Sequence, residues 1–312
     1  MKLEYVDNVG VQITGLDICK MTSQEYSNLT EIFFEQLLVS IPNQQVDPIA
    51  FAKIAYQFGD IVNLPQCVWN SAGEEIGSVR ELDPFQWQGT KESFPVQRVT
   101  GKKVNGKDSG IFGSGVLDWH SNINGVSWAP GVGLQAVAGV EGTSTSWMDT
   151  TKAYNDLSDN LKMRCEKVIG HFKYSPEVWA EGLPPWLLRF MTQGGKVLSY
   201  EMPLVNISEC GRKGLYFHFL NDCSFPSDPQ LFQILKEHCF QNKYIQTIRW
   251  RAGDIHLSHQ IFTLHRRNQD DPAILSNRIL HRLTFNFNKI YPEAKPLYIS
   301  RRAELGVGAN PY

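Results

Sequence analysis

The stretch that decides the fold reads Leu117-Asp118-Trp119-His120-Ser121-Asn122, followed at once by the turn residues Ile123-Asn124-Gly125. This pattern predicts a strand that ends in a turn. Because side chains alternate along a strand, we expect Asp118, His120 and Asn122 to share one face. An imidazole with an amide or acidic oxygen two residues later is half of a metal site that keeps coordination positions open. A second, distant imidazole would complete it, and His265 is the candidate.

The composition is typical of a globular protein, with 312 residues, 42% apolar and 20% charged residues, and a formal net charge of -2. This charge gives no electrostatic reason to expect nucleic acid or an anionic membrane as a partner. The chain has no apolar run long enough for a membrane span and no signal-peptide core, so we expect a cytoplasmic protein. A homo-oligomer is left open. The six cysteines lie far apart without a C-x-x-C pair and are predicted to be free thiols.

Local signals place several helices and strands along one chain that no Pro/Gly/Ser-rich linker divides. Helices are predicted from a capping box at Thr22 and Glu25, from Asp47-Pro48 to Gly59, over 149–158, from Ser158 to Gly170, and from Asp228-Pro229. Strands are predicted at 10–16, 132–140, 245–250, 254–258 and 279–287. Residues 60–116 read as an irregular surface loop or lid.

The order of these elements predicts an α+β fold that is mainly β, as a single domain over residues 1–312. Short strands separated by turns suggest a two-sheet antiparallel roll, a double-stranded β-helix (jelly-roll) core with flanking helices. That architecture would suit a metal site in the mouth of the barrel. The lid at 60–116 would then close over the substrate.

A series of motifs runs through the chain in a fixed order. They are W-H-S-N at 119–122, P-G-V-G-L-Q-A-V at 130–137, S-T-S-W-M-D-T at 144–150, G-R-K-G-L-Y-F at 211–217, W-R-A-G-D at 250–254, T-L-H-R at 263–266 and R-I-L-H-R at 278–282. In this order the motifs resemble the taurine dioxygenase family of iron(II)/2-oxoglutarate oxygenases. The resemblance extends from about Gly10 to Phe287.

The resemblance implies roles for six residues. His120, Asn122 and His265 would hold Fe(II), and no catalytic residue beyond this metal site is implied. Thr145 would contact the carboxylate of the co-substrate 2-oxoglutarate. Arg282, with Arg278 four residues before it, would pair with the same carboxylate, since a guanidinium offers the planar, always-charged partner that a carboxylate needs.

Asn122 departs from the family pattern, which has an aspartate at this position. An amide offers one neutral carbonyl oxygen where a carboxylate offers a full charge. Four interpretations follow: Asn122 ligates and the enzyme hydroxylates; Asp118 supplies the missing carboxylate; chloride occupies the position and the enzyme halogenates; or the site is degenerate or substituted and the protein only binds its ligand. The sequence thus predicts an oxygenase that hydroxylates or otherwise oxidises a small molecule and releases succinate and CO2, with a chloride-dependent halogenase and a metal-free binding protein as alternatives.

Overall fold

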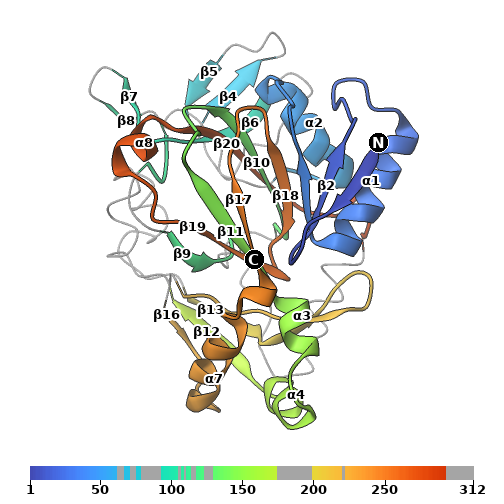
Figure 1. Ribbon diagram of the computed structural model, residues 1–312, viewed down its shortest axis with the longest axis vertical. Coiled ribbons are helices and arrows are strands. Elements are labelled where there is room, and N and C mark those ends of the chain that lie inside the picture. The colour runs from blue at the N-terminus through green and yellow to red at the C-terminus, as the bar shows by residue number, and fades with distance from the viewer. Residues whose placement is uncertain are drawn as a thin grey trace.

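The computed structural model describes residues 1–61, 67–70, 75–78, 93–104, 107–108, 110–113, 117–122, 129–173, 199–219 and 222–292. Its described part is a mixed fold in which strands dominate, as the sequence predicts (Figure 1). The helices of this part are all too short or too polar to span a lipid bilayer. Five of the six cysteines, Cys19, Cys165, Cys210, Cys223 and Cys239, carry free thiols, as predicted.

Two sheets carry most of the strands. The larger contains, in spatial order, β1 (Lys2–Tyr5), β2 (Val11–Thr14), β3 (Leu38–Ile41), β18 (Ile255–His259), β10 (Gly131–Ala138), β20 (Ile279–Phe285), β6 (Ser93–Val99), β4 (Cys67–Asn70) and β5 (Glu75–Ser78). The smaller contains β17 (Ile245–Arg249), β11 (Ser144–Asp149), β19 (Thr263–Arg267) and β9 (Leu117–His120). All named pairings in these two sheets are antiparallel except that of β2 with β3.

Strand β10 lies at the centre of the larger sheet, between β18 and β20. Its first six residues are all buried, which explains why this strand is rich in small residues. A Cβ on Gly131 would lie 2.4 Å from the ring of Phe285 on the neighbouring strand, so the close approach of that ring requires glycine.

Helix α1 (Ser23–Gln36) packs against the larger sheet at β3 and β18, and helix α2 (Pro48–Phe58) packs against it at β6 and β20. The predicted capping box of α1 is present, because Thr22 and Glu25 bond each other's backbone N–H groups. Asp47 caps α2 as predicted. Phe33 and Phe58 contact each other edge to face in the core that joins both helices to the sheet.

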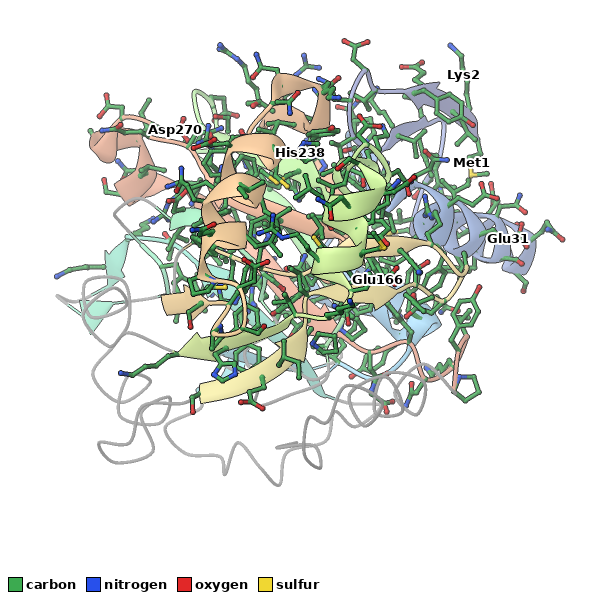
Figure 2. The ribbon with its side chains drawn as sticks, turned by 90° about the horizontal axis from the view of Figure 1, so that it is seen from below. Met1, Lys2, Glu31, Glu166, His238 and Asp270 are labelled. Carbon is green, nitrogen blue, oxygen red and sulfur yellow. The ribbon has the colours of Figure 1, made fainter. Side chains whose placement is uncertain are left out.

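A second layer of helices lies at the opposite end of the molecule from β4 and β5 (Figure 1). It contains α3 (Thr150–Asn155), α4 (Asp159–Cys165) and α7 (Pro229–Cys239), beside β12 (Ile169–Lys173), β13 (Ser199–Pro203) and β16 (Asp222–Ser224). Figure 2 looks at the molecule from this end, with Glu166 labelled beside α4 and His238 on α7. The remaining elements are β14 (Val205–Ile207) paired with β15 (Lys213–Leu215), β7 (Lys103–Val104) paired with β8 (Lys107–Asp108), α8 (Pro272–Asn277) and a 3-10 turn at Asn242–Tyr244.

Two predictions about local structure are wrong. The helix capped by Ser158 ends at Cys165, and Gly170 belongs to β12, whose alternating burial is the strand signal that the helix prediction missed. Within 60–116, residues 93–99 form strand β6, which pairs with β20 through Gln97 and Val99. This long-range pairing has no local sequence signal. Much of the predicted lid lies outside the described residues.

Candidate metal centre

Two histidines that are 145 positions apart in sequence face each other across β9 and β19. His120 and His265 are Cα partners of the antiparallel pair, and their ring centroids lie 4.2 Å apart. Both side chains are buried. The structure therefore brings together the two imidazoles that the sequence selects, at a separation that suits two ligands of one ion.

The hydrogen bonds of His120 fix its tautomer. Its Nδ1 lies 2.6 Å from the backbone oxygen of Asp118. A carbonyl oxygen only accepts, so Nδ1 carries the proton and Nε2 keeps its lone pair for a metal ion. Burial, together with the nearby positive charges of Arg282 and Arg267, lowers the pKa of His120 to about 4. The imidazole is therefore neutral at pH 7, the form that binds metals.

His265 is also held neutral. Burial lowers its pKa well below the ordinary value, and His120 and Arg282 add to this effect. Its Nδ1 is buried without a hydrogen-bond partner in the described part of the chain. Its Nε2 lies 3.2 Å from Nδ2 of Asn122. Two neutral imidazoles at this separation are the kind of donor set that fits a divalent metal.

The third predicted ligand, Asn122, lies beside His265 and is held by Gln260. Gln260 Oε1 accepts hydrogen bonds of 3.0 Å from the backbone nitrogen and from Nδ2 of Asn122. Within the described residues, no three His, Cys, Asp or Glu side chains gather as a metal-binding group. The third side chain of this centre is therefore a neutral amide.

Asp118 does not share the face of His120. Its side chain is exposed, and its Oδ1 accepts a 2.8 Å hydrogen bond from the backbone nitrogen of Trp119. The reason is an irregular pairing: Arg267 lies opposite Leu117, while His265 lies opposite His120, so β9 has an extra residue relative to β19. A bulge of this kind breaks the alternation of side chains on which the prediction of a common face rested.

A cavity opens next to the two histidines. Its apolar lining consists of Val99, Phe112, Leu117, Leu134 and Leu280. Its polar lining consists of His120, Asn122, Thr145, His265, Arg267, Arg278 and Arg282. Every predicted site residue except Asp118 thus lines one cavity.

Thr145 is held by a neighbouring tryptophan. Its Oγ1 accepts a 2.9 Å hydrogen bond from Nε1 of Trp250. Thr145 is also the Cα partner of Arg267 across β11 and β19, which places both side chains on the same side of the smaller sheet. The hydroxyl of Thr145 keeps its own proton available for an acceptor in the cavity, because Trp250 can only donate.

Three arginines contribute positive charge to the cavity. Arg278 is buried, and its Nε has no hydrogen-bond partner in the described part of the chain. Burial and the charge of Arg267, partly offset by Asp270, lower its pKa to about 9. Burial also lowers the pKa of Arg267 to about 10, while its Nη1 donates a 2.5 Å hydrogen bond to the backbone oxygen of Phe112. Both groups remain charged at pH 7.

Of the three cavity arginines, Arg282 influences both His120 and His265. It contributes to the lowered pKa of both His120 and His265, which requires its charge to be close to them. Its Nη1 donates a hydrogen bond to Oε1 of Gln97, a buried residue of β6. The cavity therefore has a positive wall, and its buried cations, Arg267 and Arg278, are stable only with an anionic or hydrogen-bonding partner.

The sequence motifs lie within the range matched by a family model. The model of the taurine catabolism dioxygenase TauD, TfdA family matches residues 4–284. The chain belongs to the taurine catabolism dioxygenase TauD, TfdA family. The family predicted from the sequence is therefore confirmed, and with it the predicted class of enzyme, a dioxygenase.

Solved structures show the same fold. A taurine dioxygenase from Burkholderia xenovorans is similar with a TM-score of 0.63 and 18% sequence identity, over 91% of this chain and 88% of that one. AAD-2 in complex with Mn(II) and N-oxalylglycine is similar with a TM-score of 0.63 and 18% identity, over 91% and 96% of the two chains. No curated protein is similar enough in sequence to match the chain.

Three further residues of this candidate site were not selected from the sequence. Gln260 holds Asn122, Trp250 holds Thr145, and Arg267 contributes a third cavity arginine. Arg267 lies two residues after His265 on the same strand, and period-two alternation is a signal that could have found it. Gln260 and Trp250 act through tertiary contacts that leave no local signal.

Proposed function

We propose that this chain is an iron(II)- and 2-oxoglutarate-dependent oxygenase that hydroxylates or otherwise oxidises a small molecule and releases succinate and CO2. One observation carries the proposal: a single cavity is lined both by two neutral histidines and by the buried cation of Arg278. The two histidines suit a divalent metal, and the Arg278 cation suits the distal carboxylate of a dicarboxylate co-substrate.

His120 and His265 would hold the metal through their Nε2 atoms. When bound, the metal would supply the redox chemistry and the open coordination positions that dioxygen and a 2-oxo acid need. The protein's own contribution is to keep both imidazoles neutral and oriented. The bond from His120 Nδ1 to the backbone of Asp118 performs the second task.

The contacts support Arg278 and Thr145 as the partners of the 2-oxoglutarate carboxylate. Arg278 is a buried cation whose Nε has no hydrogen-bond partner among the described residues, and Thr145 keeps a hydroxyl proton to donate. Arg282, the first choice from the sequence, already donates to Gln97 and lies beside the histidines. Its position supports a role nearer the metal and the substrate.

A solved relative supports the same pairing of ligands. The AAD-2 structure contains Mn(II) and N-oxalylglycine. N-oxalylglycine has the two carboxylates and the 2-oxo group of 2-oxoglutarate, with NH in place of one CH2 group. A site for a divalent metal and a 2-oxo dicarboxylate is therefore compatible with this fold.

We also propose that the two sheets form the double-stranded β-helix predicted from the sequence. The antiparallel pairing of β10 with β18 and β20, and of β11 with β17 and β19, supports this arrangement. The cavity would then lie between the sheets, since Arg282 and Leu134 come from the larger sheet and Thr145 and His265 from the smaller one.

A chloride-dependent halogenase is the second candidate, and one observation favours it. The neutral Asn122 replaces the usual carboxylate, which leaves the centre one negative charge short beside the positive charge of Arg282. A halide would restore that charge.

The test is anaerobic reconstitution with Fe(II), followed by a screen of small amines and amino acids for succinate release under air, with and without chloride. Product mass separates hydroxylation from chlorination. The matched control is His265→Ala, which should release no succinate. If the native protein binds no divalent metal, the proposal is contradicted, and the alternative of a metal-free binding protein remains.

A further inference from the structure

Gln260 is fully buried and forms hydrogen bonds with the segment that contains Asn122. Its side-chain Oε1 accepts from the backbone nitrogen and from Nδ2 of Asn122, each at 3.0 Å, and its Nε2 donates to Oγ of Ser258 at 3.0 Å. Its backbone oxygen accepts a 2.8 Å hydrogen bond from Oγ of Ser121. Its backbone nitrogen donates to the backbone oxygen of Pro130. Gln260 is therefore fixed at both its backbone and its side chain.

The backbone N–H of Asn122 decides how the Gln260 amide is oriented. A backbone N–H is always a donor, so the Gln260 atom 3.0 Å from it must be the oxygen. Ser258 does not oppose this choice, because a hydroxyl can accept from the Gln260 NH2 group. The hydrogen-bond network thus assigns the oxygen and nitrogen ends of this amide.

The orientation of Gln260 then decides that of Asn122. The Asn122 side-chain atom that contacts Gln260 Oε1 must be the amide nitrogen, since two carbonyl oxygens at 3.0 Å would repel. The same nitrogen lies 3.2 Å from Nε2 of His265. Asn122 therefore presents N–H, and not its carbonyl oxygen, to the lone pair that a metal ion would use.

We infer that Gln260 is a positioning residue that turns the oxygen of Asn122 away from the metal, so that His120 and His265 are the only side-chain ligands contributed by this cluster. The third position of the centre is then filled by a small ligand from solvent that accepts a hydrogen bond from Nδ2 of Asn122. This inference rests on the proposed function, because it assumes that the two histidines hold a metal.

The orientation of the Asn122 amide should lower the affinity of the site for metal, and replacing Gln260 should remove this effect. The Asn122 amide and a metal ion compete for the same lone pair of His265. Removing the Gln260 acceptor lets Asn122 rotate and offer its carbonyl oxygen. Gln260→Leu should therefore raise metal affinity, whereas a partner that merely supports a ligating Asn122 would lower it when lost.

The experiment is calorimetric titration of anaerobic protein with Mn(II), which needs no turnover. Asn122→Ala should leave the Mn(II) affinity unchanged or higher, and Gln260→Leu should raise it about 10-fold, within the range of outer-shell effects. In the Gln260→Leu background, Asn122→Ala should lower the affinity, because Asn122 has become a ligand. This reversal of sign is something that a merely structural role would not produce.

Gln44→Leu is the matched control, because Gln44 is another buried glutamine whose Oε1 accepts from a backbone nitrogen, that of Ile18, and it does not line the cavity. It should change thermal stability and leave the Mn(II) affinity unchanged. Titration in chloride and in gluconate identifies the small ligand: tighter Mn(II) binding in chloride assigns a halide, and equal binding assigns water.

A fall of Mn(II) affinity of about 10-fold or more in Asn122→Ala of the native background would overturn the inference, since Asn122 would then be a ligand. This result leaves the proposed function intact. The Mn(II) affinity of Asn122→Ala also tests the inference if Gln260→Leu does not fold. Absence of Mn(II) binding in the native protein, by contrast, would refute the metal centre itself and both proposals with it.

Discussion

His120 and His265 are Cα partners across β9 and β19, whereas the next pairing joins Arg267 to Leu117, so β9 bulges between its two contacts with β19. Because of this bulge, Leu117 and His120 both line the cavity and Asp118 is exposed. The bulge thus selects which polar side chains of the strand reach the metal centre. Asp118 does not line the cavity, whereas Nδ2 of Asn122 lies 3.2 Å from Nε2 of His265.

The two histidines should be individually required for metal binding. His120→Ala and His265→Ala should each reduce the Mn(II) affinity by more than about 100-fold, because even outer-shell partners account for 10- to 100-fold. Calorimetric titration measures this. His171→Ala is the control, since His171 is exposed and pairs with Glu201 away from the cavity. Retained affinity in either site variant would remove that histidine from the centre.

Arg278 should matter more than Arg282 for 2-oxoglutarate. Arg278→Met loses a charge-assisted pair in a desolvated pocket, which should cost about 2–5 kcal/mol, or roughly 30- to several thousand-fold in affinity. The titration uses Mn(II)-loaded protein and 2-oxoglutarate. Arg266→Met is the control, because Arg266 lies over the ring of Trp119 and does not line the cavity. A larger loss in Arg282→Met would restore the assignment made from the sequence.

Trp250 should support 2-oxoglutarate binding indirectly through Thr145. Trp250→Phe removes the 2.9 Å hydrogen bond to Thr145 Oγ1 and keeps the aromatic ring. Loss of one neutral hydrogen bond should weaken 2-oxoglutarate binding by about 1 kcal/mol, or roughly 5-fold. Thr145→Val should remove the same effect, so that Trp250→Phe adds nothing in that background. Additive losses would show that Trp250 acts by another route.

Asn122→Asp tests the type of reaction. A carboxylate at this position should tighten metal binding and occupy the place of a halide, so any chlorinated product should disappear while hydroxylation persists. Once Gln260 is replaced, Asn122 would already ligate through its carbonyl oxygen. The gain in Mn(II) affinity from Asn122→Asp should therefore be smaller in the Gln260→Leu background than in the native one. Product mass spectrometry and titration measure the two effects. Equal gains in both backgrounds would mean that Gln260 does not constrain residue 122.

Stability should fall as the pH drops below about 6.5. Burial lowers the pKa of His218 and His256 to about 3 and that of His281 to about 4. In the unfolded chain these groups protonate below about 6.5, so the unfolded state binds more protons and is favoured as the pH falls from 6.5 towards 4. At pH 5.5 each group should cost about 1.4 kcal/mol of unfolding free energy relative to pH 7.5.

Urea unfolding at pH 7.5, 6.5 and 5.5 measures this dependence. His281→Gln should make the decrease smaller by about 1.4 kcal/mol, because the variant has no group to protonate in the unfolded state. His171→Gln, which changes an exposed histidine, is the control. An unchanged pH dependence in His281→Gln would mean that His281 protonates in the folded protein as readily as in the unfolded chain.

The sequence by itself determined what local patterns can encode. The capping box of Thr22 and Glu25 and the cap at Asp47 set the starts of α1 and α2, because these interactions span three or four residues. The motif around His120 and the distant His265 identified the family, and most of the predicted site residues line the cavity.

Only the tertiary structure decided what depends on pairing between distant strands. The bulge in β9 exposes Asp118, the register of β20 with β6 brings Gln97 to Arg282, and the turn after β18 brings Gln260 to Asn122. Each of these contacts joins residues that are roughly 140 or more positions apart, and a one-residue shift in strand pairing would turn the side chains to the other face. The residue type at 122 is written in the sequence, but the atom that it presents to His265 is fixed by Gln260.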